Sequence, residues 1–233
     1  MLGGVFLLQR TSCATFWENF KAFNIGQMAP KRKATVASPS FDQDRFVSLD
    51  ASKRFGYKRA VIPKKGFDMG KDSFPDIVAE IKRRKWETLY EQTNAGIRVI
   101  VQKFYANAAE HRSCITKVHA QNVSFTRIAI NSCFKLPNID KDELATLENA
   151  PDYDDVLKVL CTPGTDWIWH KEELKCLKTQ TMSVSTKAWS YFLNAHLMPV
   201  SHHRDIMSDQ AVLLYAIIKG LSIDVGRVIR YSI

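Results

Sequence analysis

Residues 182–230 read MSVSTKAWSYFLNAHLMPVSHHRDIMSDQAVLLYAIIKGLSIDVGRVIR, and this stretch contains two strongly apolar helical patterns joined by a polar turn. Apolar side chains recur at helical spacing in both patterns, at Trp189, Phe192, Leu193 and Leu197 and then at Val212, Leu213, Ala216, Ile217 and Leu221. Ser183 or Ser185 is the predicted cap of the first helix, which Pro199 ends, and Lys219-Gly220 ends the second. Fully burying one large apolar side chain stabilises a protein by roughly 1.5–3 kcal/mol, so these helices are predicted to form the core.

The rest of the folded chain also predicts short helices on both sides of this core. A third C-terminal helix is expected after Ser222, which serves as its predicted cap. Upstream helices are predicted over residues 73–85, 97–108, 124–134, 140–148 and 152–160, with a strand as the alternative for residues 97–108. Residues 114–125 predict a small β-hairpin turning near residues 120–122, and residues 165–170 suit a strand or a packed loop. We therefore expect a mainly α protein with a single helical domain over residues 70–233 and at most a small β-hairpin.

The N-terminal part of the chain is different in composition. Residues 28–69 are polar and basic without periodicity, which predicts a disordered or extended basic arm whose second half is pinned to the domain by separate apolar side chains. Residues 1–27 do not resemble the rest of the chain, and Met28 opens a sequence like a natural start, so we interpret residues 1–27 as an upstream extension. A mitochondrial presequence is the alternative, although arginine is sparse and Glu18 is acidic. Because no terminating signal precedes Ile233, we expect the C-terminus to be truncated.

Positive charge is concentrated in one part of the chain. The net charge is +9, and residues 28–103 hold 17 Lys/Arg against 9 Asp/Glu, whereas residues 104–233 hold 14 of each. Such asymmetry is typical of a segment that meets a polyanion, and it is also compatible with a solubilising segment.

Two basic clusters are candidate functional sites. Lys31, Arg32 and Lys33 follow Pro30 and resemble a nuclear-import signal. Lys82, Arg83, Arg84 and Lys85 end a predicted helix, next to Trp86 and Tyr90. The four residues suit a nucleic-acid-binding patch that contacts phosphates. They equally suit a solvated helix C-terminus, where cations complement the helix dipole.

Several classes of function find no sequence support. The five cysteines are scattered without a CxxC pair, which favours a reducing compartment. The sets His196, His202, His203 and Cys161, His170, Cys176 lack the tight ligand spacing of zinc sites, so no metal is expected. The sequence has no phosphate-binding glycine motif and no apolar run of the ~20 residues that a membrane span needs, so we expect no cofactor, no small-molecule ligand and no membrane partner.

Two-metal phosphoryl chemistry would need three carboxylates brought together. The candidates are Asp152, Asp154, Asp155, Asp209 and Asp224. Most of them stand where a helix N-terminus favours acidic side chains, and structural roles therefore explain them better than catalysis. We expect no enzyme.

Several segments resemble a plant family described as putative plant transposon proteins. The matching pieces are RFVS (45–48), KFYANA (103–108), IN (130–131), LP (136–137), LCTPGTDW (160–167), KAWSYF (187–192), LMPVSH (197–202), LLYAI (213–217) and GLSIDVG (220–226). The resemblance implies derivation from a mobile element, and the family transfers no catalytic residues to this chain.

Together these features predict a non-enzymatic, transposable-element-derived nuclear protein that contacts nucleic acid through its basic N-terminal part. One alternative is a helical protein–protein interaction module or self-associating protein. Two further alternatives are a relic without function and a metal-dependent transposase or nuclease.

Overall fold

The computed structural model describes residues 41–56, 73–90, 98–119, 121–170, 173–198 and 204–233. These residues are mainly α-helical, as the sequence predicts, and they divide into two compact units. Within the described residues, unit 1 comprises 41–56 and 98–125, and unit 2 comprises 73–90 and 126–233. This division differs from the expected single domain over residues 70–233, because the segment 98–125 belongs with residues that precede it in the chain. The predictions for residues 1–40 lie outside the described residues.

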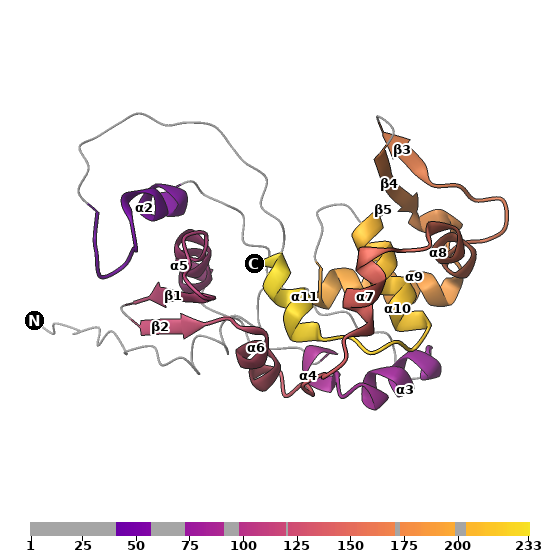
Figure 1. The fold of residues 1–233 in the computed structure, drawn as a ribbon, viewed down its shortest axis with the longest axis horizontal. Helices are drawn as coiled ribbons and strands as arrows, with labels where there is room; N and C mark the ends of the chain where they lie inside the picture. The colour runs from indigo at the N-terminus through magenta and orange to yellow at the C-terminus, as the bar shows by residue number, and fades with distance from the viewer. Residues whose placement is uncertain (1–40, 57–72, 91–97, 120, 171–172, 199–203) are drawn as a thin grey trace, which may run out of the picture. The chain divides into compact units, whose positions relative to one another are not determined.

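Unit 1 combines two helices with a β-hairpin (Figure 1). Its elements are α2 (Leu49–Gly56), α5 (Arg98–Ala108), β1 (Ile115–Val118) and β2 (Gln121–Ser124). The helix and the hairpin predicted for this region are confirmed, with Val118 paired to Gln121 across the antiparallel strands. Helix α2 lies in the stretch for which an extended arm was expected. Its Phe55 packs against buried Phe46 with ring centroids 5.3 Å apart.

Unit 2 contains the apolar core that the C-terminal sequence predicts. Its helices are α3 (Pro75–Arg83), α4 (Glu87–Tyr90), α6 (Arg127–Cys133), α7 (Glu143–Asn149), α8 (Tyr153–Leu160), α9 (Val184–His196), α10 (Ser208–Ile218) and α11 (Val225–Ser232), with a 3-10 turn at Thr179–Thr181. Helix α10 packs against α7, α8 and α9, and most of its side chains are buried. It is the central helix of the unit because its sequence is apolar on nearly every side.

A three-stranded antiparallel sheet covers part of this core. Its strands are β3 (Ile168–His170), β4 (Glu173–Lys178) and β5 (Asp205–Met207), in the order β3-β4-β5. The sequence predicts only a polar turn over residues 200–206, so the strand at 205–207 corrects that expectation. It forms because Ile206 pairs with Leu177, and both side chains are buried.

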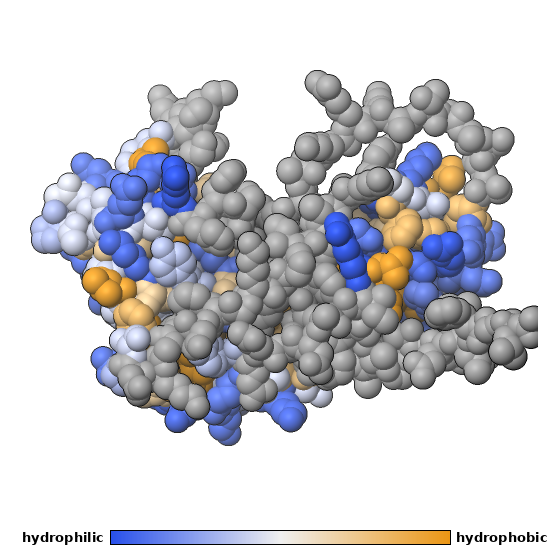
Figure 2. All heavy atoms as spheres, turned by 180° about the vertical axis from the view of Figure 1, so that it is seen from behind, coloured by the Kyte–Doolittle hydropathy of each residue, from blue (hydrophilic) through white to orange (hydrophobic). Residues whose placement is uncertain are grey.

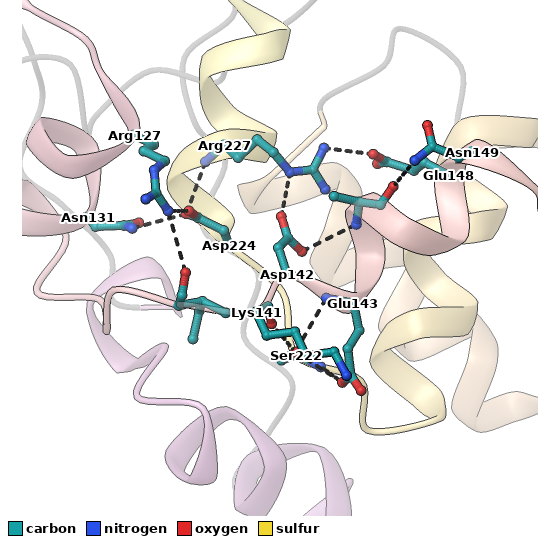
Figure 3. A network of polar contacts seen from close by, with 12 residues as sticks. Arg127, Asn131, Lys141, Asp142, Glu143, Glu148, Asn149, Ser222, Asp224 and Arg227 are labelled. Carbon is teal, nitrogen blue, oxygen red and sulfur yellow. Dashed lines mark hydrogen bonds and ion pairs between the residues drawn. The ribbon is translucent and has the colours of Figure 1, made fainter.

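A buried carboxylate fixes the start of the last helix (Figure 3). Asp224 is 1% exposed and caps α11 by accepting a 3.2 Å hydrogen bond from the backbone N–H of Arg227. Two side chains of α6 also donate to it, Arg127 at 2.7 Å and Asn131 at 3.0 Å. Ser222, the predicted cap, instead contacts Glu143 and the carbonyl of Lys141. The capping prediction is therefore wrong by two residues.

The same helix is tied to α7 by Arg227. Its guanidinium contacts Asp142 at 2.5 Å and Glu148 at 2.6 Å, and Asp142 is itself the N-cap of α7. Since Asp224 and Arg227 lie within one helical turn, polar contacts join the N-terminal end of α11 to both α6 and α7 (Figure 3). Burial alone would raise the pKa of Asp224, but the hydrogen bonds from Arg127, Asn131 and the Arg227 backbone lower it below its ordinary value.

Substitution of Gly226 tests how closely α11 approaches α6. A Cβ at this position would overlap the backbone oxygen of Arg127 and lie 2.5 Å from Asn131 Oδ1. Gly226→Ala should therefore lower the free energy of unfolding by about 1–3 kcal/mol, despite the better helix propensity of alanine. The measurement is chemical denaturation followed by circular dichroism.

The matched control is Gly56→Ala, where no atom lies within 4 Å of the added methyl group. This variant should remain within about 0.5 kcal/mol of the wild type. An unchanged free energy of unfolding for Gly226→Ala would contradict the described packing of α11 on α6.

Candidate nucleic-acid interface

The basic run predicted as a phosphate-contacting patch lies where α3 ends. Lys85 adopts a left-handed conformation with φ 57°, and the N–H of Trp86 donates back to the carbonyl of Ile81 at 2.9 Å. This hydrogen-bond pattern is a common way to end a helix. It sends the next side chain inward, and Trp86 is 2% exposed and stacks on Phe192. Trp86 therefore anchors the end of the basic run to the apolar core of unit 2.

Arg84 is part of the interior rather than of the surface. It is 8% exposed and donates to the carbonyls of Leu221 at 2.8 Å and Ile217 at 3.2 Å. The Ile217 carbonyl lies in the last turn of α10, where a cation complements the helix dipole, and Leu221 lies in the segment that follows the helix. The guanidinium also contacts Glu80 at 2.6 Å and lies 5.0 Å from the Trp86 ring. Burial lowers the pKa of Arg84, and Glu80 offsets part of that effect.

Arg83 is exposed but already paired. Its side chain is 58% exposed and makes two hydrogen bonds to the carboxylate of Glu80, at 2.6 and 2.5 Å. The hydrogen bond from Arg83 is the main reason that the pKa of Glu80 is lowered. Sequence reasoning missed Glu80, although its spacing of three and four residues from the two arginines is the usual signal for helical ion pairs.

Lys82 and Lys85 are the two members of the run that remain available. Both are exposed, and within the described part of the chain neither forms an ion pair. The structure thus divides the predicted four-residue patch into two free lysines, one paired arginine and one buried arginine. The other cluster, Lys31, Arg32 and Lys33, lies outside the described residues.

A cleft of about 580 Å³ adjoins this helix within unit 2. It lies between α3, the N-terminal turn of α9 and the C-terminal end of α10. Its charged lining residues are Asp76, Glu80, Arg83 and Lys219, so acidic and basic side chains balance. The cleft therefore has no charge preference for an anion, unlike the lysines at the end of α3.

Four of the five aspartates considered for phosphoryl chemistry, Asp152, Asp155, Asp209 and Asp224, have structural partners. Asp152 caps α8 through the backbone N–H groups of Asp154 and Asp155, at 3.1 and 3.0 Å. Asp155 accepts from the Tyr215 hydroxyl at 2.5 Å, and this hydrogen bond lowers the pKa of Asp155 and raises that of Tyr215 to about 12. Asp209 accepts from the backbone N–H of Gln210. Over the described ranges, no group of three or more His, Cys, Asp or Glu residues is placed to hold a metal ion.

The loose His/Cys sets are similarly dispersed. His202 and His203 lie outside the described residues, and His196 is 9% exposed with its ring against Phe192. Cys161 and Cys176 are buried free thiols. Among the helices that the structure describes, none is long and apolar enough to cross a membrane.

Comparison with known proteins identifies the family. Residues 82–233 match the family model described as "Putative plant retrotransposon-related domain". The match covers more than half of the chain, and the chain therefore belongs to this family. This finding confirms the expectation of a transposon-derived plant protein. No curated protein and no solved structure matches the chain.

Arg84 and Lys82 should respond very differently to the same substitution. Arg84→Met removes the donors to the carbonyls of Ile217 and Leu221 and the buried partner of Glu80, and should cost about 3 kcal/mol of unfolding free energy. Lys82→Met, at an exposed position, should stay within about 0.5 kcal/mol of the wild type. Urea denaturation measures both, and equal effects would contradict the structural role of Arg84.

Proposed function

We propose that this retrotransposon-derived protein is non-enzymatic and contacts nucleic acid electrostatically. The observation that supports the proposal best is the pair of exposed lysines, Lys82 and Lys85, at the end of α3. They lie in the part of the chain, residues 28–103, that holds almost the entire positive excess. Exposed cations without an ion pair are the groups that replace condensed counterions on a phosphate backbone.

The expected binding is weakly dependent on base sequence. Lysine ammonium groups act as compact point charges and contact phosphates, which position a protein but do not specify bases. Arg83 adds a third exposed cation, but its two bonds to Glu80 would have to be exchanged for phosphate contacts. Arg84 belongs to the fold of unit 2 and is not part of the proposed interface.

The non-enzymatic part of the proposal rests on the aspartates. Asp152 and Asp224 cap helices, and Asp155 is engaged by Tyr215 and Lys219. A nuclear location is also part of the proposal, because Lys31, Arg32 and Lys33 resemble an import signal.

A helical protein-interaction surface remains the alternative. On α9 to α11 the exposed large apolar side chains are Val184, Tyr191, Ile218 and Tyr231, and the view in Figure 2 shows apolar residues in small groups among hydrophilic ones.

Salt dependence of nucleic-acid binding tests the proposed interface. The slope compared is that of the logarithm of the association constant for duplex DNA against the logarithm of the salt concentration. In the full chain, Lys82→Gln combined with Lys85→Gln should reduce the magnitude of this negative slope by about 1.8, because each phosphate contact contributes about 0.9. The measurement is fluorescence anisotropy of labelled DNA over a salt series.

The matched control is Lys135→Gln combined with Lys158→Gln, which removes two exposed lysines elsewhere in unit 2. This control should keep the wild-type slope. Equal losses in both double variants would indicate that net charge alone governs binding. No salt-dependent binding by the wild type would overturn the proposed function and favour the protein-interaction alternative.

A further inference from the structure

Unit 1 contains a buried lysine that has no carboxylate partner among the described residues. Lys103 lies on α5 and is 5% exposed. Its hydrogen-bond partner is His119, with Nζ and Nε2 separated by 2.9 Å. Because an ammonium group is a donor only, the imidazole is the acceptor and is neutral in this arrangement. Burying an ammonium group beside a neutral partner leaves its charge uncompensated.

A fully buried asparagine places the surrounding basic groups. Asn107 follows Lys103 by one helical turn, so the two side chains lie on the same face of α5. Asn107 Nδ2 donates to the carbonyl of Arg45 at 3.0 Å and to that of Lys117 at 2.7 Å. Asn107 therefore ties both the segment with Arg45 and the hairpin whose turn contains His119 to α5.

The charged side chains that act on the ammonium group are Arg45 and Asp42. The positive charge of Arg45 lowers the pKa of both Lys103 and His119, and the negative charge of Asp42 opposes this effect on Lys103. Asp42 lies 3.8 Å from Arg45 Nε, and both side chains are about half exposed, so this pair is screened by water. Burial lowers the pKa of Lys103, with Arg45 adding to the effect. Burial, Lys103 and Arg45, in that order, lower the pKa of His119.

We propose that Lys103, His119 and Arg45 form a binding site for the oxyanion of a phosphate group. The group is either free inorganic phosphate or a phosphate of a nucleic-acid backbone, since both present the same oxygens. Arg45 and His119 are partly exposed, so the outer side of the cluster is open to solvent. The site lies in unit 1 and does not depend on binding by Lys82 and Lys85.

A bound phosphate group would supply the negative charge and the hydrogen-bond acceptors that Lys103 lacks among the described residues. The two N–H groups of Lys103 that have no acceptor in the described part of the chain would donate to its oxygens, and the guanidinium of Arg45 matches two of those oxygens at once. A protonated His119 would no longer accept from Lys103, but it would donate to the anion instead. An anion in contact with the imidazole favours its charged form, so binding should raise the pKa of His119.

Phosphate titration followed by NMR of the His119 ring tests this site in the full-length protein. At constant ionic strength, millimolar inorganic phosphate should shift the His119 ring signal saturably and raise its pKa by about one unit relative to chloride. A separate titration with a short oligothymidylate distinguishes the two sources. A saturable shift with the oligonucleotide indicates backbone phosphate, and a shift with inorganic phosphate alone indicates a free-phosphate site.

Variants identify the residues that hold the anion. Lys103→Met keeps the apolar stem and should abolish the saturable shift, and Arg45→Gln, at a half-exposed position that does not threaten folding, should weaken phosphate binding several-fold. Lys117→Met, on an exposed residue of the same hairpin, should behave like the wild type. Identical responses to phosphate and chloride, or a wild-type response in Arg45→Gln and in folded Lys103→Met, would overturn the proposal.

Discussion

The buried carboxylate of Asp224 is the interaction on which the C-terminal half of unit 2 depends. Its oxygens accept hydrogen bonds from the backbone N–H of Arg227 in the first turn of α11 and from the side chains of Arg127 and Asn131 on α6. The side chain of Arg227, three residues later, ties the same turn to Asp142, the N-cap of α7. A carboxylate that is 1% exposed is tolerated only with this full set of donors. The apolar helices supply most of the burial, and this polar junction determines how the last helix enters the core.

The helices of unit 2 could be predicted because their apolar residues recur with the helical period. The N-cap at Ser183 and the long apolar pattern of α10 are local signals, and the structure confirms both. The sequence did not indicate β5, since its pairing partner is β4, about 30 residues earlier. Local chemistry also favoured Ser222 over Asp224 as a cap, and the donors from α6 that select Asp224 are more than 90 residues away in the chain.

The candidate interface was predictable in position but not in detail. A run of four basic residues indicates a cationic helix end, yet it does not show which members are engaged. Arg84 is buried because the end of α10 comes to it from a distant part of the chain, whereas the pairing of Arg83 with Glu80 was visible in their spacing. Lys103 and His119 are 16 residues apart, on a helix and at a hairpin turn, and only the fold brings them together.

The most direct test of the role of Asp224 is the pH dependence of unfolding for the wild type and for Asp224→Asn, which keeps the shape and removes the charge. A carboxylate whose folded-state pKa is lowered contributes stability above its unfolded pKa of about 3.9, and this contribution is lost as the pH falls through the folded value. The account predicts that Asp224→Asn is less stable by about 3 kcal/mol at pH 7 and that the difference narrows below pH ~4. Equal free energies of unfolding for the two proteins at every pH, or a difference that stays constant down to pH ~2, would contradict the account.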